Sequence, residues 1–365
     1  MSDHPVVLAA GGTGGHLYPA LAVYNALQEH NLPARLFTDE RGLAFAKDFD
    51  VQDIDVVPSG GLVSGDPLKR ATSLLKLARG WLVSRKLLQK YGAAGVIGFG
   101  GYASAPPILA ASQLGIPSML KQGDAILGRA NAFVAGRVSK ICLGFPNTGG
   151  VSKTVLNKVA VVGVPLRQEI EALHASPYSG PRRRISILCL GGSLGAKAFN
   201  TLVPKAISNL NQDQRSQIRL VQQVTSNQDR ETLATTYREM RIDAKLLHYI
   251  DDMAGELSQS DLVIARSGST TVHEISAIGR AAIFIPAGIH ADGQQRHNAQ
   301  YLQEAGAAWI VEQNESAPSG LNEILRNVLE KPQQLAHKAA LAKEKAILGA
   351  AHTIVGYAKS EFKLA

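Results

Sequence analysis

The sequence has 365 residues, of which 45% are hydrophobic and 19% are charged. This composition indicates a globular protein with a substantial core and excludes a disordered or fibrous chain. The formal net charge is +8, and most of the excess lies in the first 165 residues. A basic half predicts contact with phosphate groups, nucleic acid or an anionic membrane.

The first half of the chain alternates between strand-like and helix-like segments. Residues 5–10 are an apolar strand-like run, and a glycine-rich loop follows them. Apolar side chains then recur at helical spacing over residues 17–31, and residues 34–39 resemble a second strand. Later strands are expected at 95–101, 138–145 and 159–167. This order predicts an α/β fold with a doubly wound parallel sheet.

The second half restarts the same pattern. Residues 185–190 are followed by a glycine turn and a helix, and further strands are expected at 218–224, 244–250, 261–268 and 281–287. The letters AAGGTGGH near residue 10 are echoed by CLGGSLGA near residue 191. We therefore expect two similar domains in tandem, residues 1–165 and 166–345, facing each other across a ligand-binding cleft.

Residues 68–92 form a basic amphipathic segment without an acidic residue. Its basic side chains alternate with apolar ones at roughly helical spacing: Lys69, Arg70, Lys76, Arg79, Arg85, Lys86 and Lys90 with Leu74, Leu75, Ala78, Trp81 and Leu82. Such a helix lies on anionic lipid or packs on the sheet with a solvated basic face, and both interpretations remain open here. Nucleic-acid binding is disfavoured because no aromatic stacking platform accompanies the charge.

Cysteine usage and the N-terminus bear on the cellular compartment. Cys142 and Cys189 lie in apolar strand-like runs, so we expect buried thiols rather than a disulfide or a metal site. The sequence shows no signal-peptide pattern and no apolar stretch of about 18 residues. We therefore expect a protein of the cytosol or of a membrane surface.

The two glycine loops fit neither the dinucleotide fingerprint nor the P-loop. Each should still place free backbone N–H groups at the start of a helix, an arrangement that binds phosphate or diphosphate without a metal. His16 follows the first loop directly. The helix dipole disfavours its charged form, which makes it a candidate general base; a helix-capping or phosphate-contacting histidine is the alternative.

Two further polar stretches follow predicted strands in the second half. Residues 265–274 combine hydroxyl side chains with Glu274, which could accept hydrogen bonds from ribose hydroxyls; a plain capping arrangement is the alternative. Residues 290–299 contain Gln294 and Gln295, whose side-chain amides could form hydrogen bonds with sugar hydroxyls.

No metal site is expected. His290, Asp292 and His297 match no common metal-ligand spacing. Asp53 and Asp55 resemble the acidic pair that holds a metal in one class of glycosyltransferases, but two solvent-facing carboxylates on a strand edge are the preferred interpretation.

Taken together, seven stretches resemble one family in family order over nearly the whole chain. They are residues 11–22, 98–106, 162–167, 191–196, 249–253, 266–274 and 290–299. The family is MurG, the UDP-N-acetylglucosamine–lipid I N-acetylglucosaminyltransferases of bacterial cell-wall synthesis. The resemblance implies a glycosyltransferase-B fold of two Rossmann-like domains, with the last helix, in residues 346–365, returning to the first domain.

The resemblance also implies the activity and the partners. N-acetylglucosamine would pass from UDP-N-acetylglucosamine to the muramyl 4-hydroxyl of lipid I, giving lipid II in one inverting displacement without a cofactor. The protein would sit peripherally on the cytoplasmic face of the inner membrane and meet cell-wall synthesis and division proteins. His16 would help to deprotonate the acceptor hydroxyl.

Residue by residue, the motif matches imply three sets of contacts. In the donor set, Ile250 would meet the uracil through its backbone, Glu274 the ribose, and Gln294 and Gln295 the sugar. The remaining donor contacts would be Thr13, Gly14, Gly15, Asp124, Arg167, Ser193, Ser269, Thr270, Thr271, Val272 and His273. The lipid I diphosphate would lie near Gly11, Gly12, Tyr102 and Ser104. The membrane dock would be Leu74, Leu75, Arg79, Trp81, Leu82, Arg85 and Lys86.

One stretch departs from the family pattern. Residues 121–124 read KQGD where the family usually has HEQN, so Asp124 replaces an asparagine that lies close to donor sugar and acceptor, and Lys121 could offset the added charge. Val164 also replaces an asparagine. These changes leave two alternatives to an active enzyme: a weakened paralogue that binds UDP-sugar or lipid carrier, or a same-fold transferase with another acceptor.

Overall fold

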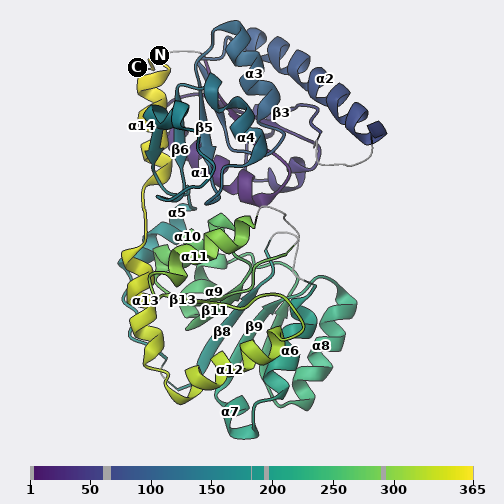
Figure 1. The fold of residues 1–365 in the computed structure, drawn as a ribbon, viewed down its shortest axis with the longest axis vertical. Helices are drawn as coiled ribbons and strands as arrows, with labels where there is room; N and C mark the ends of the chain where they lie inside the picture. Colours follow the sequence, from purple (N-terminus) through teal and green to yellow (C-terminus); the bar gives the residue numbers. More distant parts are fainter. Residues whose placement is uncertain (1–3, 61–66, 182, 193–196, 289–292, 365) are drawn as a thin grey trace. The chain divides into compact units, whose positions relative to one another are not determined.

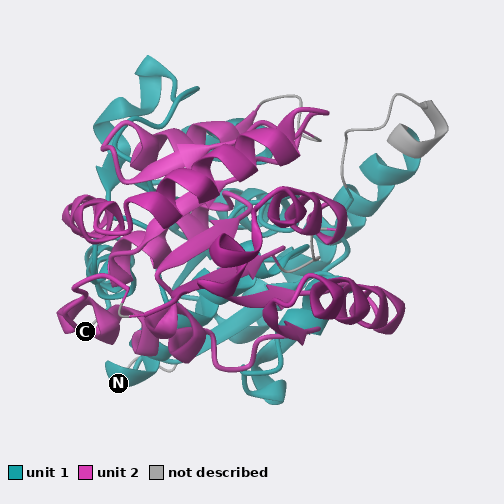
Figure 2. Ribbon diagram, turned by 90° about the horizontal axis from the view of Figure 1, so that it is seen from below, with its two compact units in different colours: residues 1–167, 347–365 teal, residues 168–346 magenta. Residues whose placement is uncertain are grey.

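The computed structural model describes residues 4–60, 67–181, 183–192, 197–288 and 293–364. Residues 67–70 are described as backbone only. The chain divides into two compact units, each with its own sheet (Figure 2). The first unit is Met1–Arg167 together with Ile347–Ala365, and the second is Gln168–Ala346.

Within its described residues, the first unit holds a seven-stranded sheet in which every pairing is parallel. The strand order is β3 (Ile54–Val56), β2 (Ala34–Thr38), β1 (Val6–Ala9), β4 (Gly95–Gly98), β5 (Ser118–Gln122), β6 (Lys140–Leu143) and β7 (Val159–Val161). The direction of winding reverses at β1, between β2 and β4. Ligands of such sheets bind outside the carboxyl ends of the strands at this reversal.

Helices cover both faces of the first sheet (Figure 1). One face packs against α1 (Gly14–Glu29) and α14 (Ala350–Glu361), and the C-terminal helix thereby joins the first unit. The other face packs against α2 (Pro67–Tyr91), α3 (Ala105–Leu114) and α4 (Arg129–Val134). Both faces are buried, which is why these strands are continuous apolar runs rather than alternating ones.

Within its described residues, the second unit repeats this plan with a six-stranded parallel sheet. The order is β10 (Asp243–Leu247), β9 (Ile218–Gln223), β8 (Ile185–Leu190), β11 (Leu262–Ala265), β12 (Ala281–Phe284) and β13 (Ala308–Ile310). The reversal lies between β8 and β11. The two sheets therefore confirm the doubly wound α/β class expected from the sequence.

The helices of the second unit form two groups. One face of the sheet carries α6 (Phe199–Ser208), α8 (Asn227–Glu239) and α12 (Ala317–Glu330), whose apolar side chains fill a single core. Next to α10 (Ser269–Ile278) pack α5 (Gln168–Ala172), α9 (Met253–Gln259), α11 (Gln294–Gln303) and α13 (Gln334–Glu344). The short α7 (Gln212–Ser216) precedes β9.

β3 corresponds to the strand edge expected at Asp53 and Asp55, whereas two other strands of the structure, β5 and β13, have no counterpart among the expected strands. β5 was missed because its run ends in Lys121 and Gln122, which are polar but buried. β13 was missed because it has only three residues. Cys142 and Cys189 are free, buried thiols, as expected. Among the described residues, no helix is long and apolar enough to cross a membrane.

Candidate functional site

The first unit brings two glycine loops together at the reversal of its sheet. β1 is followed by the loop that begins at Gly11, and the neighbouring β4 is followed by Gly100 and Gly101. These two glycines have φ values of +98° and +70°, a region that side-chain-bearing residues rarely adopt. Any side chain at either position would also press on the His16 ring. The histidine thus lies against the second loop while it belongs to the helix that follows the first.

A hydrogen bond fixes the orientation of the His16 imidazole. Nδ1 lies 3.0 Å from the carbonyl oxygen of Gly11. A carbonyl oxygen only accepts, so Nδ1 carries the proton and donates. The neutral ring therefore presents an unprotonated Nε2, the atom that faces the Gly100 position. This is the tautomer that a general base acting through Nε2 requires.

Electrostatics hold His16 in the neutral form. Burial lowers the pKa of the imidazole below its ordinary value, and this outweighs the opposing effects of the Asp124 carboxylate and the Gly11 carbonyl. The positive charge of Lys121 lowers the pKa further. At neutral pH the ring is therefore free to accept a proton.

Asp39, which directly follows β2, organises the first glycine loop. Its Oδ1 accepts hydrogen bonds from the amides of Gly12 at 3.0 Å and Gly42 at 2.9 Å. Its Oδ2 accepts from Arg41 and from the Ser59 hydroxyl, at 2.8 and 2.9 Å. These donors hold the pKa of Asp39 below its usual range despite burial. The sequence analysis missed this carboxylate, although an acidic residue after the second strand of a Rossmann-like unit was a readable signal.

Three residues expected at the acceptor diphosphate have other tasks in the structure. The Gly12 amide is already bonded to Asp39. Gly11 is buried, and a Cβ there would clash with Ala103, so its lack of a side chain serves loop packing. Ser104 is 1% exposed, and its hydroxyl faces the carbonyls of Ala9 and Gly100. All three therefore shape the loops, whereas Tyr102 is half-exposed, and the placement of the acceptor diphosphate near these residues stays a prediction.

The stretch 121–124, which departs from the family pattern, is held in place by hydrogen bonds of the Gln122 side chain. The Gln122 amide donates to the carbonyls of Asp124 and Ile126 at 3.0 and 2.8 Å. Its oxygen accepts from the Gly128 amide at 3.2 Å and from Asn131 at 2.8 Å. Both polar atoms of the side chain are therefore used. The replacement of the family's glutamate by Gln122 is visible in the sequence, whereas the role of Gln122 in shaping the loop is visible only in the structure.

Lys121 places a positive charge near His16 and Asp124. Its side chain is 1% exposed, and burial lowers its pKa to about 8, an effect that the Asp124 carboxylate opposes. The lysine therefore remains largely protonated at neutral pH. It offsets the negative charge that Asp124 adds, in the direction expected from the sequence.

Asn131, at the start of α4, was also missed. Its side chain is 3% exposed and donates to Gln122, while its Oδ1 is buried without a partner among the described residues. Its Nδ2 approaches the Gly100 position that the His16 ring also borders. The side chain was present in the sequence, but only the fold brings it to this loop.

The second unit has a polar turn at the reversal of its own sheet, after β11. Gly268 precedes α10 and no side chain caps the helix, so the first amides of α10 have no intrahelical acceptor. Thr270 keeps a buried hydroxyl without a partner in the described part of the chain. Ser267 donates to the carbonyl of Gln295, and Asn298 donates to the carbonyl of Ser267. These bonds tie the start of α10 to the start of α11.

Along α10, the expected donor residues divide into two groups. Ser269, Thr270 and Thr271 lie in the first turn, and Glu274 is 7% exposed in the next. Val272 is fully buried, and His273 is 1% exposed, bonds the Ser269 carbonyl through Nδ1 and stacks on the Tyr301 ring. The side chains of Val272 and His273 therefore pack inside the unit, and their assignment to the donor set stays a prediction.

The other residues expected to contact the donor lie in different elements of the chain. Gln295 uses its side-chain oxygen to accept from the Ala287 amide, whereas Gln294 is half-exposed at the start of α11. Ile250 is 4% exposed. Arg167 belongs to the first unit, where its guanidinium lies 5.6 Å from the Tyr18 ring centroid. Ser193, His290 and Asp292 lie outside the described residues.

Curated relatives match almost the full length of the chain. A Rhizobium etli protein is 40% identical over 345 residues, covering 94% of this chain and 91% of its own length. An Agrobacterium fabrum protein is 37% identical over 347 residues, with 94% and 90% covered. Both are named UDP-N-acetylglucosamine–N-acetylmuramyl-(pentapeptide) pyrophosphoryl-undecaprenol N-acetylglucosamine transferase. The chain belongs to this transferase family.

Domain and structure comparisons agree with this family. Residues 6–143 match the glycosyltransferase family 28 N-terminal domain, and residues 186–354 match the C-terminal domain. The Acinetobacter baumannii MurG crystal structure superimposes with a TM-score of 0.77 at 29% identity, covering 98% of this chain and 99% of that one. UDP-GlcNAc 2-epimerase from Neisseria meningitidis, bound to UDP-GlcNAc, shares the fold at 14% identity with a TM-score of 0.63 over 96% and 98% of the two chains. The resemblance to MurG and the glycosyltransferase-B fold are thus confirmed.

In this family member, α2 presents a mixed apolar and basic line to solvent. Leu75, Arg79, Leu82 and Lys86 are all exposed and recur at spacings of four, three and four residues, so they share one face of the helix. Leu75 and Leu74 are 70% and 56% exposed. Trp81 and Arg85 are only half-exposed, and Trp81 packs against the core under the helix. The exposed face therefore consists of leucines and basic residues.

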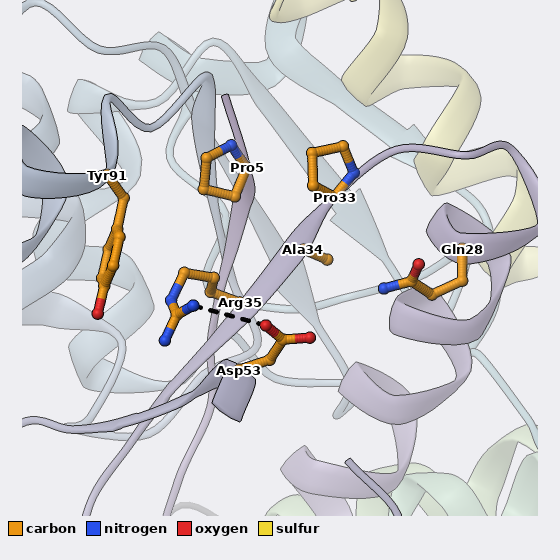
Figure 3. Close-up of a pocket in the computed structure, with 7 residues that line it drawn as sticks. All are labelled: Pro5, Gln28, Pro33, Ala34, Arg35, Asp53 and Tyr91. Atoms are coloured by element: carbon orange, nitrogen blue, oxygen red, sulfur yellow. Dashed lines mark hydrogen bonds and ion pairs between the residues drawn. The ribbon is translucent and has the colours of Figure 1, made fainter. Parts of the chain in front are cut away.

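A shallow pocket of the first unit lies away from the glycine loops, at the amino ends of β1 and β2 (Figure 3). Arg35 there bonds Asp55 at 3.0 Å and Asp53 at 3.5 Å and covers the Tyr91 ring. The two aspartates are half-buried and paired rather than solvent-facing, which corrects the expectation. Among the described residues, no group of three metal-ligating side chains is found.

Proposed function

We propose that this transferase moves N-acetylglucosamine from UDP-N-acetylglucosamine to the muramyl 4-hydroxyl of lipid I, the undecaprenyl-diphosphate-linked muramyl pentapeptide, and so forms lipid II. The observation that carries the chemistry is His16. Its neutral imidazole is oriented by Gly11 and presents an unprotonated Nε2 beside two glycine loops. No other described side chain of these loops combines a basic atom with a depressed pKa.

The reaction is a single displacement with inversion at the anomeric carbon. His16 Nε2 takes the proton of the acceptor hydroxyl while the hydroxyl oxygen attacks the anomeric carbon. The bond from that carbon to the β-phosphate oxygen breaks, and UDP leaves with the bonding electron pair. The uncapped amides of α10 and the hydroxyls of Ser269, Thr270 and Thr271 stabilise the diphosphate charge, and Glu274 binds the ribose.

The first unit, with α14, would hold the lipid-linked acceptor, and the second unit would hold the donor nucleotide. The first glycine loop has amides near both proposed ligands, of which Gly14 and Gly15 were assigned to the donor and Gly12 to the acceptor. Because the Gly12 amide is occupied, the open amides of the first loop are those at the start of α1, Gly14 and Gly15. Asp124 and Arg167 would meet the donor from the first unit.

The acceptor carries a polyprenyl chain, so the enzyme must work at a membrane. The exposed face of α2, with leucines beside Arg79 and Lys86, suits the headgroup region of an anionic bilayer. We propose peripheral attachment to the cytoplasmic face of the plasma membrane through this helix.

The KQGD stretch supports an active enzyme rather than a damaged one. The four hydrogen bonds of Gln122 hold the loop, and Lys121 offsets the charge of Asp124. A binding-only paralogue would not require an intact, oriented and neutral His16.

The test is transfer of labelled N-acetylglucosamine from its UDP donor to a lipid I analogue by the purified protein, with and without a chelator. We expect transfer in both conditions, since α10 supplies amides and hydroxyls to the leaving diphosphate. A protein that binds UDP-N-acetylglucosamine without transferring it would refute the proposal. If Asp124→Asn then restored transfer, the KQGD change would be identified as the cause.

A further inference from the structure

Arg41 stands beside the first glycine loop and is held there by Asp39. Its Nε and Nη2 donate to Oδ2 of Asp39 at 3.2 and 2.8 Å. A Cβ at Gly12 would lie 3.6 Å from Nη2, which places the guanidinium against the loop backbone. The Asp39 side chain is 7% exposed, whereas the Arg41 side chain is 68% exposed. A buried carboxylate thus anchors an accessible cation.

This arrangement changes what the loop offers an anion. The Gly12 amide is directed at Asp39, so the loop has lost one donor that a bound diphosphate could use. Arg41 restores a donor at the same point and adds a positive charge. The carboxylate occupies only Nε and one edge of Nη2, and a guanidinium has five N–H groups in a fixed fork. Nη1 has no partner among the described residues and remains for a ligand.

Stability alone does not account for the pair. Because the Arg41 guanidinium is 68% exposed, water screens its attraction to the carboxylate, and such screened ion pairs contribute little to the free energy of unfolding, about 0 to 1 kcal/mol. The buried carboxylate is already satisfied by two amides and the Ser59 hydroxyl. What the pair adds is a fixed direction for the guanidinium, and a planar fork of this kind suits phosphate oxygens.

We propose that Arg41 binds the diphosphate of the lipid-linked acceptor and that Asp39 is the positioning residue that aims it. The inference rests on the proposed function for the identity of the acceptor. It adds a specificity-determining contact for that acceptor, because a diphosphate offers the anchored guanidinium more negative charge and more acceptor oxygens than a monophosphate does. The donor also contains a diphosphate, so the test must separate the two sources.

The first experiment measures binding without turnover. A short prenyl diphosphate, the matching prenyl monophosphate and UDP are titrated separately into wild type and Arg41→Gln by calorimetry. We expect the wild type to prefer the prenyl diphosphate over the monophosphate and Arg41→Gln to lose about tenfold in diphosphate affinity, as for one charge-assisted hydrogen bond. UDP affinity should not change. Arg137→Gln is the matched control, because Arg137 is an exposed first-unit arginine whose guanidinium donates to the carbonyl of Phe133 in α4.

The second experiment measures steady-state transfer. Arg41→Gln should raise KM for the lipid I analogue while kcat and KM for UDP-N-acetylglucosamine stay near wild type. Arg41→Lys should recover only part of the loss, since an ammonium lacks the fork. Unchanged prenyl-diphosphate binding and acceptor KM in Arg41→Gln would overturn the inference, as would an equal loss for UDP. If the wild type showed no transfer, the proposed function would be contradicted instead. The calorimetric titrations would then decide by themselves whether Arg41 binds the prenyl diphosphate.

Asp39 is tested with Asp39→Asn, which keeps one oxygen for the Gly12 and Gly42 amides but turns an amide group toward Arg41. The acceptor KM should rise as in Arg41→Gln, and the double variant should be no worse than either single one. Additive losses would show that Asp39 does not act through Arg41. Thermal unfolding of each variant shows whether a substitution has destabilised the fold. If Asp39→Asn is unstable, Arg41→Gln still tests the proposal, because the Arg41 side chain lies on the surface.

Discussion

The turn after β1 and the turn after β11 both lie where the winding of their own sheet reverses, yet they carry residues suited to different chemistry. The first carries a titratable imidazole, an anchored guanidinium and a carboxylate that organises the loop. The second carries hydroxyls, open amides and one buried carboxylate, and is held by Ser267 and Asn298. We propose that the same strand–turn–helix plan moves a proton in one unit and binds a nucleotide in the other.

The largest expected effect is loss of the base in the first turn. His16→Ala should lower kcat by about 10²- to 10⁴-fold, because general-base catalysis contributes that much. KM for UDP-N-acetylglucosamine should stay within a few-fold, since the donor turn is untouched. His352→Ala, an exposed histidine of the same unit, is the control for steady-state transfer. If donor binding fell in His16→Ala as much as kcat does, the first turn would also serve the donor, and the proposed division of tasks between the two turns would be contradicted.

The second turn should respond in the opposite way. Glu274→Gln should raise KM for UDP-N-acetylglucosamine by roughly 10- to 100-fold, as expected when hydrogen bonds to a charged group are weakened. The acid limb of the pH–rate profile should not move. Glu330→Gln, on the surface of α12, serves as the control in the same assay. A shifted pH profile with unchanged donor KM would assign Glu274 to proton transfer and contradict the division of tasks.

The pH dependence sharpens the account of the first turn. A base must be unprotonated, so kcat/KM for the acceptor falls as pH drops through the pKa of His16. Asp124 raises that pKa and Lys121 lowers it. Asp124→Asn should therefore move the acid limb to lower pH, and Lys121→Met should move it to higher pH. Shifts with the same sign in both variants would contradict the charges assigned around the imidazole.

The smallest effect is expected at α2, far along the chain from either turn. Leu75→Glu with Leu82→Glu should reduce sedimentation with anionic vesicles several-fold, because apolar area and attraction to the lipid surface are both lost. Transfer to a short-chain, water-soluble acceptor should be unchanged. Leu156→Glu replaces a leucine that is 55% exposed outside α2 and should leave vesicle binding intact. If Leu156→Glu reduced vesicle binding as much as the two α2 substitutions do, the result would contradict membrane attachment through α2.

The sequence was informative wherever function depends on local pattern. The run from β1 through the glycine loop to α1 was predicted closely, and so was α2, because glycine clusters and helical spacing are visible in a single segment. Asp39 was not found, since its meaning comes from Gly12, which lies 27 residues earlier in the chain. β5 was missed because burial of Lys121 and Gln122 cannot be inferred from polar letters.

The same limit applies to residues whose type suits ligand binding. Ser104 and Gly12 have residue types that suit phosphate binding, but their hydrogen-bonding groups are used by neighbouring strands and loops. His273 has the type of a catalytic residue, yet it packs against Tyr301. Residue type and spacing predict which groups could bind a ligand, whereas the tertiary hydrogen bonds determine which groups remain available.

The most direct test of the central claim is a single-turnover measurement of N-acetylglucosamine transfer across pH, in wild type and His16→Ala, with donor and acceptor saturating. The account predicts a wild-type rate that falls in acid with an apparent pKa below that of an unperturbed imidazole, about 6.5. The His16→Ala rate should be low and without that limb. An acid limb that persists unchanged in His16→Ala would show that another group accepts the proton.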